Sequence, residues 1–415
     1  MTTETDIYVL DPAGQAIYTE IENVRAIGPV ARVELPGGLP AWMVTDYAAI
    51  KTLLTHPMVS KDAALHWGDL AAGKVPQNWP LMPWVGKAGM FTAYGADHRR
   101  LRRIASPAFT QHRTDQLRPM VQKSVADALE QISLDHPAAA NASRPTSLDL
   151  RERFCFPIPI AAIGGLLGVD DDLFPVIKAG ADALFDTSVT PEELGARFMG
   201  LLGGIEELVR RKTEHPDDSL TSALIQANAD GDRYTPEEIA ETVRVVIVAG
   251  YETTVNLLDQ AIFNLLTHPQ HLAAVQDGRI TWDDVVDETL RCTSPAANVP
   301  LRFAVEDIEV AGTTIRKGEA ILTSFAGAGR DPEVHGQPGT FDPGRENKDH
   351  LGFGYGAHRC LGAPLAVLEA TVALPMLFDR YPHMVLAEDP ATIPANPGFI
   401  TNGHQRLLVN LSPTD

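Results

Sequence analysis

The stretch FGYGAHRCLG, residues 353–362, places one cysteine among three glycines. Glycine permits positive φ angles and close approach of the backbone to a flat ligand, so the chain is expected to pass tightly against something here. Residues 363–380 then have helix-forming composition, and Pro364 is tolerated in a first turn. Cys360 would therefore lie at a helix N-terminus, where amide dipoles favour the thiolate that a soft metal ion binds.

An alternative interpretation is a buried structural cysteine beside a glycine-rich turn, which is the commoner state of a single cysteine in a reducing compartment. The two other cysteines, Cys155 and Cys292, belong to no CxxC pair, so the sequence predicts no disulfide framework. Cysteine usage thus fits a reducing compartment, and the interpretation of Cys360 depends on the rest of the chain.

The composition is that of an acidic chain of 415 residues with a formal net charge of −20. An acidic surface repels nucleic acid and anionic membranes, so neither is an expected partner. Residues 1–10 are polar and acidic and lack the features of a signal peptide, and no later segment is apolar for long enough to span a membrane. We therefore expect a soluble cytoplasmic protein. The length allows one or two domains.

The first hundred residues predict a small sheet, short helices and a long loop. Residues 30–35 alternate apolar and polar side chains, residues 36–38 are a Pro-Gly-Gly turn, and residues 41–44 form a second strand. Short helical pieces follow over residues 46–61. Residues 65–94 are rich in Trp, Met, Gly and Pro, which indicates a long apolar loop that either faces a ligand or packs on the core.

Two predicted helices carry charged side chains on one face. In residues 97–103, His98 and Arg102 are four residues apart, and in residues 282–292, Glu288 and Arg291 are three apart. Both patterns are also typical of solvated helix surfaces, where an exposed pair contributes only about 0.3–0.5 kcal/mol. Spacing alone does not separate a binding face from an ordinary surface. Residues 120–215 are helix-rich and carry no chemical signal, and strands are predicted over residues 308–310 and 320–324.

A long helix is predicted over residues 235–266, because Thr-Pro-Glu-Glu is a strong helix start. Within its apolar part lies Ala249-Gly250-Tyr251-Glu252-Thr253-Thr254. Glycine and a buried acid both cost stability there, so their presence needs an explanation. One explanation is a kinked helix whose threonines bond their own backbone. The other is a functional acid and hydroxyl pair.

Residues 353–362 resemble the haem-binding loop of the cytochrome P-450 monooxygenases, in which Phe, two glycines, a basic residue or His, the ligating Cys and a further Gly recur at this spacing. Five separated matches to that family occur in its order over roughly residues 97–362, and motif matches gain weight when their context agrees. In this family a cysteine thiolate holds the iron and favours O–O cleavage. The resemblance implies that Cys360 is the metal ligand.

The resemblance assigns cofactor-binding positions along the chain. It implies that His98, Arg102 and Arg302 bind haem propionates and that Ala249 and Gly250 form part of an oxygen groove. In the loop itself it implies contacts from Phe353, Gly354, His358, Cys360 and Gly362. The implied cofactor is non-covalent haem b, iron protoporphyrin IX, with dioxygen as co-substrate; the absence of a CxxCH motif agrees.

Further family positions concern catalysis and structure. Glu252 and Thr253 match the acid and alcohol pair that relays protons to bound dioxygen, although Tyr251 stands where the family often has His. Glu288 and Arg291 match the family's Glu-x-x-Arg, and Arg345 matches the arginine that completes a buried structural network. Gly329 departs from the Asn that is common at its position.

The resemblance also predicts the architecture. It implies a mainly α fold with a small β region, residues 1–415 forming one domain, and haem between the long helix over residues 235–266 and the Cys360 loop. The segment around residues 184–198 is a lid over the substrate in that family, although a core role fits its sequence equally well. The predicted substrate pocket consists of Met82, Trp84, Met90, Phe91, Phe185, Val246, Val299 and Phe399.

The implied activity is hydroxylation of a bulky apolar small molecule. The sequences around residue 79 and over residues 96–100 look most like those of actinobacterial family members that oxidise steroid or polyketide-like substrates. The chain has no glycine-rich flavin or nicotinamide fingerprint, so a ferredoxin and a ferredoxin reductase are the expected electron donors. A basic patch suited to an acidic ferredoxin is predicted from Arg99, Arg100, Arg103, His112, Arg113 and Arg359.

Two other functions are compatible with a haem-thiolate chain. A peroxygenase would use hydrogen peroxide directly, but relatives of that kind replace the acid and alcohol pair, so Glu252 and Thr253 count against it. A non-enzymatic haem sensor would need an output module, and no DNA-binding or kinase segment is visible in the sequence.

Overall fold

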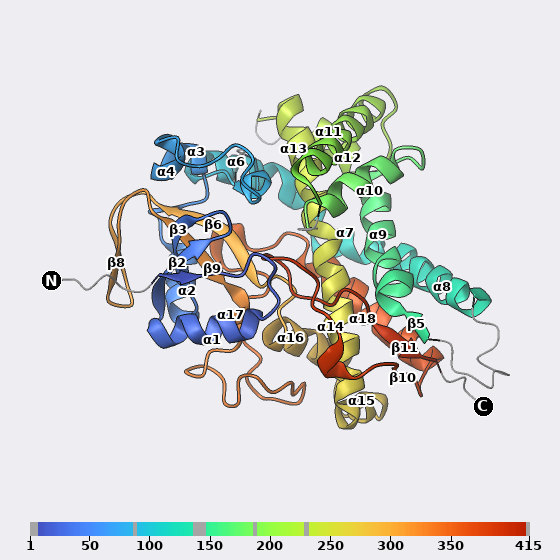
Figure 1. Ribbon diagram of the computed structural model, residues 1–415. Helices are drawn as coiled ribbons and strands as arrows, with labels where there is room; N and C mark the ends of the chain where they lie inside the picture. Colours follow the sequence, from blue (N-terminus) through green and yellow to red (C-terminus); the bar gives the residue numbers. More distant parts are fainter. Residues whose placement is uncertain (1–6, 86–88, 136–146, 186–188, 228–231, 412–415) are drawn as a thin grey trace.

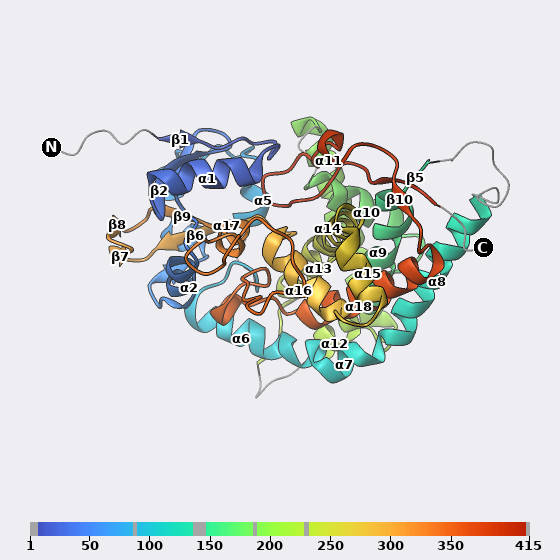
Figure 2. The same ribbon diagram turned by 90° about the horizontal axis from the view of Figure 1, so that it is seen from below.

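The computed structural model describes residues 7–85, 89–135, 147–185, 189–227 and 232–411. Helices make up most of these residues, and most of the strands gather at one side of the molecule beside the N-terminal segment (Figures 1 and 2). This is the mainly α fold with a small β region that the sequence predicts. Within the described ranges, every helix is too short or too polar to span a lipid bilayer.

The largest sheet has the strand order β1-β2-β3-β9-β6-β4. Its strands are β1 (Tyr8–Val9), β2 (Val30–Leu35), β3 (Leu39–Val44), β4 (Val59–Ser60), β6 (Asn298–Ala304) and β9 (Ala320–Ser324). The predicted hairpin is confirmed: β2 and β3 are antiparallel, with Val30 opposite Val44. The sheet brings the start and the last third of the chain together, since β3 pairs with β9 and β4 pairs with β6.

Two smaller sheets complete the β region. One has the order β10-β11-β5, and the other is the antiparallel pair β7-β8. Their strands are β5 (Ser147–Asp149), β7 (Ile308–Val310), β8 (Thr313–Ile315), β10 (Val385–Leu386) and β11 (Leu408–Asn410).

The helices follow the predicted segments closely at several places. The first six are α1 (Ile17–Ile27), α2 (Tyr47–Thr55), α3 (Ala63–His66), α4 (Gly68–Ala71), α5 (Met82–Val85) and α6 (Gly95–Ala105). The next six are α7 (Gln111–Gln116), α8 (Arg118–Asp135), α9 (Pro157–Leu167), α10 (Phe174–Ala183), α11 (Pro191–Glu214) and α12 (Leu220–Gln226). The last six are α13 (Pro236–Gly250), α14 (Glu252–Thr267), α15 (Pro269–Gln276), α16 (Trp282–Cys292), α17 (Phe325–Gly329) and α18 (Ala363–Arg380).

The loop expected over residues 65–94 is less irregular than its sequence suggests. Helices α4 and α5 are single turns within it, and α3 ends at its start. Asp62 caps α3 by accepting a hydrogen bond from the backbone N–H of Leu65 at 3.0 Å. Residues 86–88 of this loop lie outside the described residues.

The predicted single helix over residues 235–266 is divided at Tyr251 into α13 and α14. Its start is as expected, because Thr235 and Glu238 form a reciprocal capping box. At the break, Thr253 Oγ1 donates to Ala249 O at 2.8 Å and Thr254 Oγ1 donates to Gly250 O at 3.2 Å. The side-chain hydroxyls thus bond the carbonyls of the last two residues of α13, next to the break.

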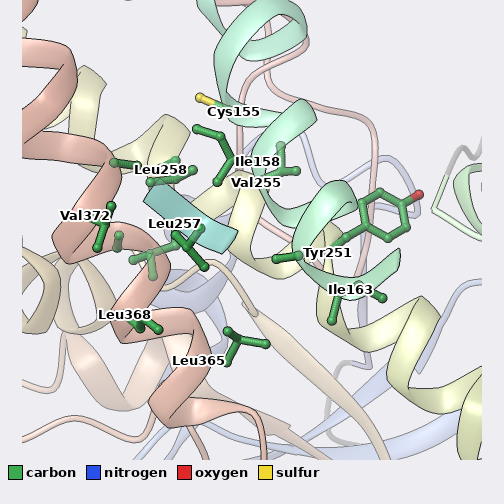
Figure 3. Packing of buried hydrophobic residues seen from close by; sticks show 14 of the residues in the cluster. Cys155, Ile158, Ile163, Tyr251, Val255, Leu257, Leu258, Leu365, Leu368 and Val372 are labelled. Carbon is green, nitrogen blue, oxygen red and sulfur yellow. The ribbon is translucent and has the colours of Figure 1, made fainter. Parts of the chain in front are cut away.

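A hydrophobic core lies where α14 packs between α9 and α18 (Figure 3). In this cluster Leu257 and Leu258 of α14 lie between Ile158 of α9 and the side chains Leu368 and Val372 of α18. Cys155 is fully buried on the α9 side of the same cluster. This packing fixes α14 relative to the N-terminus of α18, and therefore relative to the Cys360 loop.

Candidate active site

A cavity of about 250 Å³ lies between the α13–α14 break and the Cys360 loop. Ala249, Gly250, Thr253 and Thr254 line one side of it. The opposite side is lined by Phe353, Gly354, His358, Cys360, Leu361 and Gly362. This is the place that the sequence predicts for haem.

The loop geometry explains its glycines. Gly354 and Gly356 have φ angles of +69° and +70°, in the left-handed region that favours glycine. A Cβ on Gly356 would also meet the Leu54 carbonyl oxygen at 2.7 Å. The N–H of Cys360 donates to Phe353 O at 2.8 Å and closes the loop. The cysteine therefore stands three residues before α18, on a backbone held by its own hydrogen bond.

The sulfur of Cys360 faces opposing influences. Cys360 is exposed towards the open cavity, yet the protein atoms around the sulfur still raise the pKa of the thiol by desolvation, which is the largest effect. Hydrogen bonds from the N–H groups of Gly362 and Ala363 and the charge of Arg102 lower that pKa. A metal ion bound at this sulfur would deprotonate the thiol outright.

Cationic and hydrogen-bonding side chains gather at one edge of the cavity. Arg102, Arg302 and His358 line it, and the ring of His98 lies 3.8 Å from that of His358, centroid to centroid. Arg302 Nη1 donates to Thr323 Oγ1 at 2.7 Å. Burial lowers the pKa of Arg302 to about 10 and that of His98 to about 4. At neutral pH His98 is therefore a neutral donor beside two guanidinium groups.

These residues fit a flat cofactor that carries carboxylates. His98 Nε2 is buried and has no hydrogen-bond partner among the described residues. Arg102 Nη2 donates to Arg359 O at 2.7 Å, which leaves its other N–H groups available. A thiolate ligand on one face and unsatisfied donors at one edge match haem with its propionates.

The acid and alcohol of the α13–α14 break point in different directions. Thr253 lines the cavity, whereas Glu252 lies outside the lining and is almost fully buried. Glu252 Oε1 accepts hydrogen bonds from Arg151 Nη2 at 2.8 Å, Asn256 Nδ2 at 3.2 Å and Asn396 Nδ2 at 3.3 Å. Burial raises the pKa of Glu252, and the charge of Arg151 opposes that rise. Arg151, which nothing in the sequence singled out, is the partner of this acid.

The predicted structural network is assembled as expected. Arg291 forms two hydrogen bonds of 2.7 Å to the carboxylate of Glu288, and Arg345 Nε donates to Glu288 Oε1 at 3.0 Å. The side chains of Glu288 and Arg291 are completely buried. The departure at Gly329 has a local reason, because a Cβ there would meet Arg291 O at 2.0 Å.

Four of the eight residues predicted for the substrate pocket line the cavity, namely Met90, Phe91, Val246 and Val299. Met82, Trp84, Phe185 and Phe399 do not. Met82 and Phe399 pack in the core of the sheet region, and Trp84 contacts Phe185 edge-on with ring centroids 5.1 Å apart. Aromatic side chains in an apolar loop pack on each other as readily as they face a ligand, and sequence does not distinguish the two.

The predicted basic patch is partly neutralised. Arg100 is paired with Glu238, and Arg103 with Asp232. The exposed members without a described acidic partner are Arg99, His112, Arg113 and Arg359.

Comparisons with known proteins agree with this geometry. The family model described as cytochrome P-450 matches residues 202–279 and 280–408. The 2-hydroxy-5-methyl-1-naphthoate 7-hydroxylase of Streptomyces carzinostaticus is 38% identical over 405 residues, covering 97% of this chain and 97% of that enzyme. The chain belongs to the cytochrome P-450 family.

Solved structures place this P-450 beside actinobacterial members. CYP154A1 from Streptomyces coelicolor A3(2) has 44% identity and a TM-score of 0.89, covering 97% of this chain and 100% of that one. The testerone-bound CYP154C4 from Streptomyces sp. ATCC 11861 has 37% identity and a TM-score of 0.92, covering 100% of this chain and 99% of that one. This P-450 is thus a monooxygenase of the bacterial type, as its motifs predict.

Three residues of this P-450 were missed by sequence reasoning. Lys61 and Glu369 line the cavity and are buried, and Arg151 holds Glu252. The only available signal was a charged residue within an apolar surrounding, such as Glu369 between Leu368 and Ala370 in a helix. For Lys61, in the run Ser-Lys-Asp, no such signal exists.

Proposed function

We propose that this P-450 hydroxylates a bulky apolar small molecule of the steroid or polyketide-like kind. The observation that carries the proposal is the cavity wall opposite Cys360, which is built from apolar side chains with few polar groups. Its apolar members include Met90, Phe91, Ile163, Val246, Leu257 and Val299. Each apolar side chain that a ligand buries contributes on the order of 1.5–3 kcal/mol, so a large apolar ligand is favoured over a small polar one.

The names of two relatives agree with this substrate class. A vitamin D(3) 25-hydroxylase from Pseudonocardia autotrophica is 32% identical, and a 6-deoxyerythronolide B hydroxylase from Saccharopolyspora erythraea is 31% identical. Their names give vitamin D(3) and 6-deoxyerythronolide B as the molecules hydroxylated, whereas the 38% identical relative is named for 2-hydroxy-5-methyl-1-naphthoate. The named substrates are thus of more than one kind, and the choice of a bulky apolar molecule rests on the apolar cavity wall.

The proposed cofactor is haem b, held without a covalent bond to the porphyrin. Cys360 would provide the iron ligand, and Arg102, Arg302, His98 and His358 would bind the propionates. When bound, haem supplies oxygen activation, to which the thiolate contributes electron density. The apolar wall orients the substrate and excludes water, so that the reacting carbon is held near the oxygen groove.

We further propose that Glu252 and Thr253 deliver protons. Thr253 holds its hydroxyl at the cavity surface through the bond to Ala249 O, where it is placed to position a water molecule. Glu252 stands behind it, held by Arg151 and two amides through one oxygen only. The raised pKa of Glu252 keeps the carboxyl closer to a proton-donating range than a solvated acid.

Electrons are proposed to come from a ferredoxin and its reductase. Arg359 directly precedes Cys360 and is exposed, as are Arg99 and Arg113. The proposed docking surface consists of these exposed cations, on a chain whose net charge is −20. A local basic surface is what an acidic redox protein requires for docking, and such contacts act mainly on the association rate.

The test is a ligand screen followed by turnover. Purified holoenzyme is titrated with steroids, macrolides and small aromatic compounds, and the low-to-high-spin Soret shift is recorded. Every ligand that shifts the spectrum is then incubated with ferredoxin, ferredoxin reductase, NADPH and ¹⁸O₂. We expect at least one bulky apolar ligand to yield a hydroxylated product that carries ¹⁸O. Binding restricted to small charged acids contradicts the substrate class.

The same assay separates the other haem-thiolate functions. Turnover with hydrogen peroxide but none with the electron donors indicates a peroxygenase. Spectral shifts without any product, under either condition, indicate a sensor.

A further inference from the structure

Lys61 is a buried lysine at the edge of the cavity. Its side chain lines the cavity, only 4% of the residue is exposed, and its Nζ lies 3.4 Å from the ring centroid of Phe91. Among the described residues, no carboxylate oxygen lies within 4.0 Å of Nζ. A buried ammonium group without an anion is costly, since burial disfavours its charge. The cation–π contact with Phe91 offsets only part of that cost.

The position of Lys61 is fixed by the sheet. Ser60, the last residue of β4, pairs with Phe303 of β6, and Lys61 follows Ser60 beside Arg302. Asp62, the next residue, caps α3 and so anchors the backbone on the other side. The backbone of Lys61 is therefore anchored on both sides, and its side chain lies at the cavity edge next to Arg302.

The charged and titratable groups that act on the pKa of Lys61, or on which Lys61 acts, are Arg302, His98 and His358. The pKa of Lys61 is lowered by burial and then by the charge of Arg302, and its own charge lowers the pKa values of His98 and His358. The side chains of Lys61, Arg302, His98 and His358 therefore lie close enough for their charges to interact. Repulsion among Lys61, Arg102 and Arg302 is unfavourable unless an anion joins them.

We propose that Lys61 binds a carboxylate group in this cavity and that a propionate of the bound haem supplies it. Two features favour the propionate. Lys61 stands at the same edge as the proposed propionate donors His98, Arg102, Arg302 and His358. Arg102 and Arg302 also have protein acceptors, namely Arg359 O and Thr323 Oγ1, whereas the contact recorded for Lys61 within the described part of the chain is the face of Phe91. The inference rests on haem binding in this cavity and not on the proposed substrate class.

The first experiment measures haem retention in substrate-free holoenzyme. Lys61→Met, Lys61→Gln and Lys61→Arg are compared with wild type by the rate of haem transfer to excess apomyoglobin and by the reduction potential of the iron. We expect Lys61→Met to transfer haem about 10-fold faster or more, because a charged hydrogen bond is lost. Loss of a nearby positive charge should also make the potential more negative. Lys61→Arg should restore both properties.

Two controls separate carboxylate binding from other roles. Lys123→Met removes an exposed lysine that pairs with Asp127, and it should change neither measurement. Lys61→Gln keeps a polar side chain without the charge, and its haem transfer rate should lie between those of wild type and Lys61→Met. If Lys61→Arg reproduces Lys61→Met in both measurements, the lysine serves packing, and the proposal is overturned. If Lys61→Met yields no holoenzyme, Lys61→Gln, which keeps a neutral donor, replaces it.

A second experiment tests the other source of the carboxylate, an acidic substrate. Spectral dissociation constants are measured for an aromatic carboxylic acid and for its methyl ester, in wild type and in Lys61→Met. We expect the ratio of the two constants to be the same in both proteins. If Lys61→Met abolishes a preference for the acid and leaves haem transfer unchanged, the ligand supplies the carboxylate and the propionate assignment is overturned. No change in either experiment overturns carboxylate binding altogether.

Discussion

The network around Glu288 and the cation cluster at the cavity edge are both buried, but they differ in whether the protein compensates their charges. Glu288 meets Arg291 and Arg345 within 3.0 Å. By contrast, Lys61 and Arg302 are each only 4% exposed, and no described carboxylate pairs with either. The desolvation cost is of the same kind in both places. A network that is complete without ligand serves the fold, whereas a cluster that lacks its counter-ion indicates what must bind.

Breaking the complete network should have the largest effect. Arg291→Met leaves Glu288 buried with a single remaining arginine, and loss of one partner of a buried pair costs about 3–5 kcal/mol. We expect a correspondingly lower denaturant midpoint, measured by unfolding of the holoenzyme. The matched control is Arg279→Met, because Arg279 and Asp277 form an ion pair with both side chains about two-thirds exposed, and it should cost less than about 1 kcal/mol. Equal effects of the two substitutions would contradict the distinction.

Glu369 is a single buried acid whose charge the described part of the protein also leaves without a counter-ion. It is fully buried, its Oε2 has no partner among the described residues, and burial raises its pKa from 4.5 to about 8. As the pH rises, this carboxyl group ionises in the unfolded chain at a lower pH than in the folded protein. The stability that the neutral acid provides is therefore complete below pH 4.5 and is lost as the pH rises towards 8.

Glu369→Gln should remove that pH dependence. We expect the melting temperature of the variant, relative to wild type, to rise between pH 5 and pH 8 by an amount equivalent to on the order of a few kcal/mol. Thermal unfolding of both holoenzymes in a pH series measures it. A difference that stays constant over this range means that Glu369 has a partner, and it would remove this acid from the set of uncompensated charges.

Removing a member of the cation cluster should affect the cofactor more than the fold. Arg302→Met should accelerate haem loss by a factor equivalent to about 1.5–3 kcal/mol, the usual value of a hydrogen bond to a charged group. Arg302 has no carboxylate partner among the described residues, so the substitution leaves no buried acid unpaired. The far-UV circular dichroism of the protein should therefore be unchanged. Haem transfer to apomyoglobin gives the rate. If Arg302→Met lowers the stability of the fold while haem stays bound, Arg302 stabilises the polypeptide, as the Glu288 network does, and not the cofactor.

Local sequence predicts local structure well in this chain. Helices over residues 282–292 and 363–380 have the expected bounds, because Thr281 and Pro364 are strong start signals. The pairing of Glu288 with Arg291 is also local, because the two residues are three apart in one helix. The break at Tyr251 agrees with the kinked helix that the sequence offered as one explanation, since Thr253 and Thr254 bond helix carbonyls there. The close approach of Gly250 to Ile163, where a Cβ would meet that side chain at 2.6 Å, is tertiary and is not readable from local sequence.

The partners of buried charges are the part that sequence does not provide. Arg151 reaches Glu252 from 101 residues away, and Lys61 meets Arg302 only because β4 and β6 pair. The register of two short strands and the packing of a π-helical turn, Arg151–Cys155, decide these contacts. Such pairings are tertiary, so the residues look like ordinary surface charges in the sequence. A family resemblance supplies only the positions that its motif contains.

The smallest expected effect on stability, and the sharpest on function, concerns Thr253. Thr253→Ala removes one hydroxyl, whose bond to Ala249 O contributes about 1 kcal/mol, and should leave haem content and ligand affinity nearly unchanged. If the hydroxyl positions water for proton delivery, product per NADPH should fall sharply and hydrogen peroxide should appear in its place. Thr254→Ala is the matched control, since Thr254 also lines the cavity and bonds a helix carbonyl, that of Gly250. Coupling that survives in Thr253→Ala, or that is lost equally in Thr254→Ala, would assign both hydroxyls to the helix break and leave proton delivery to other groups.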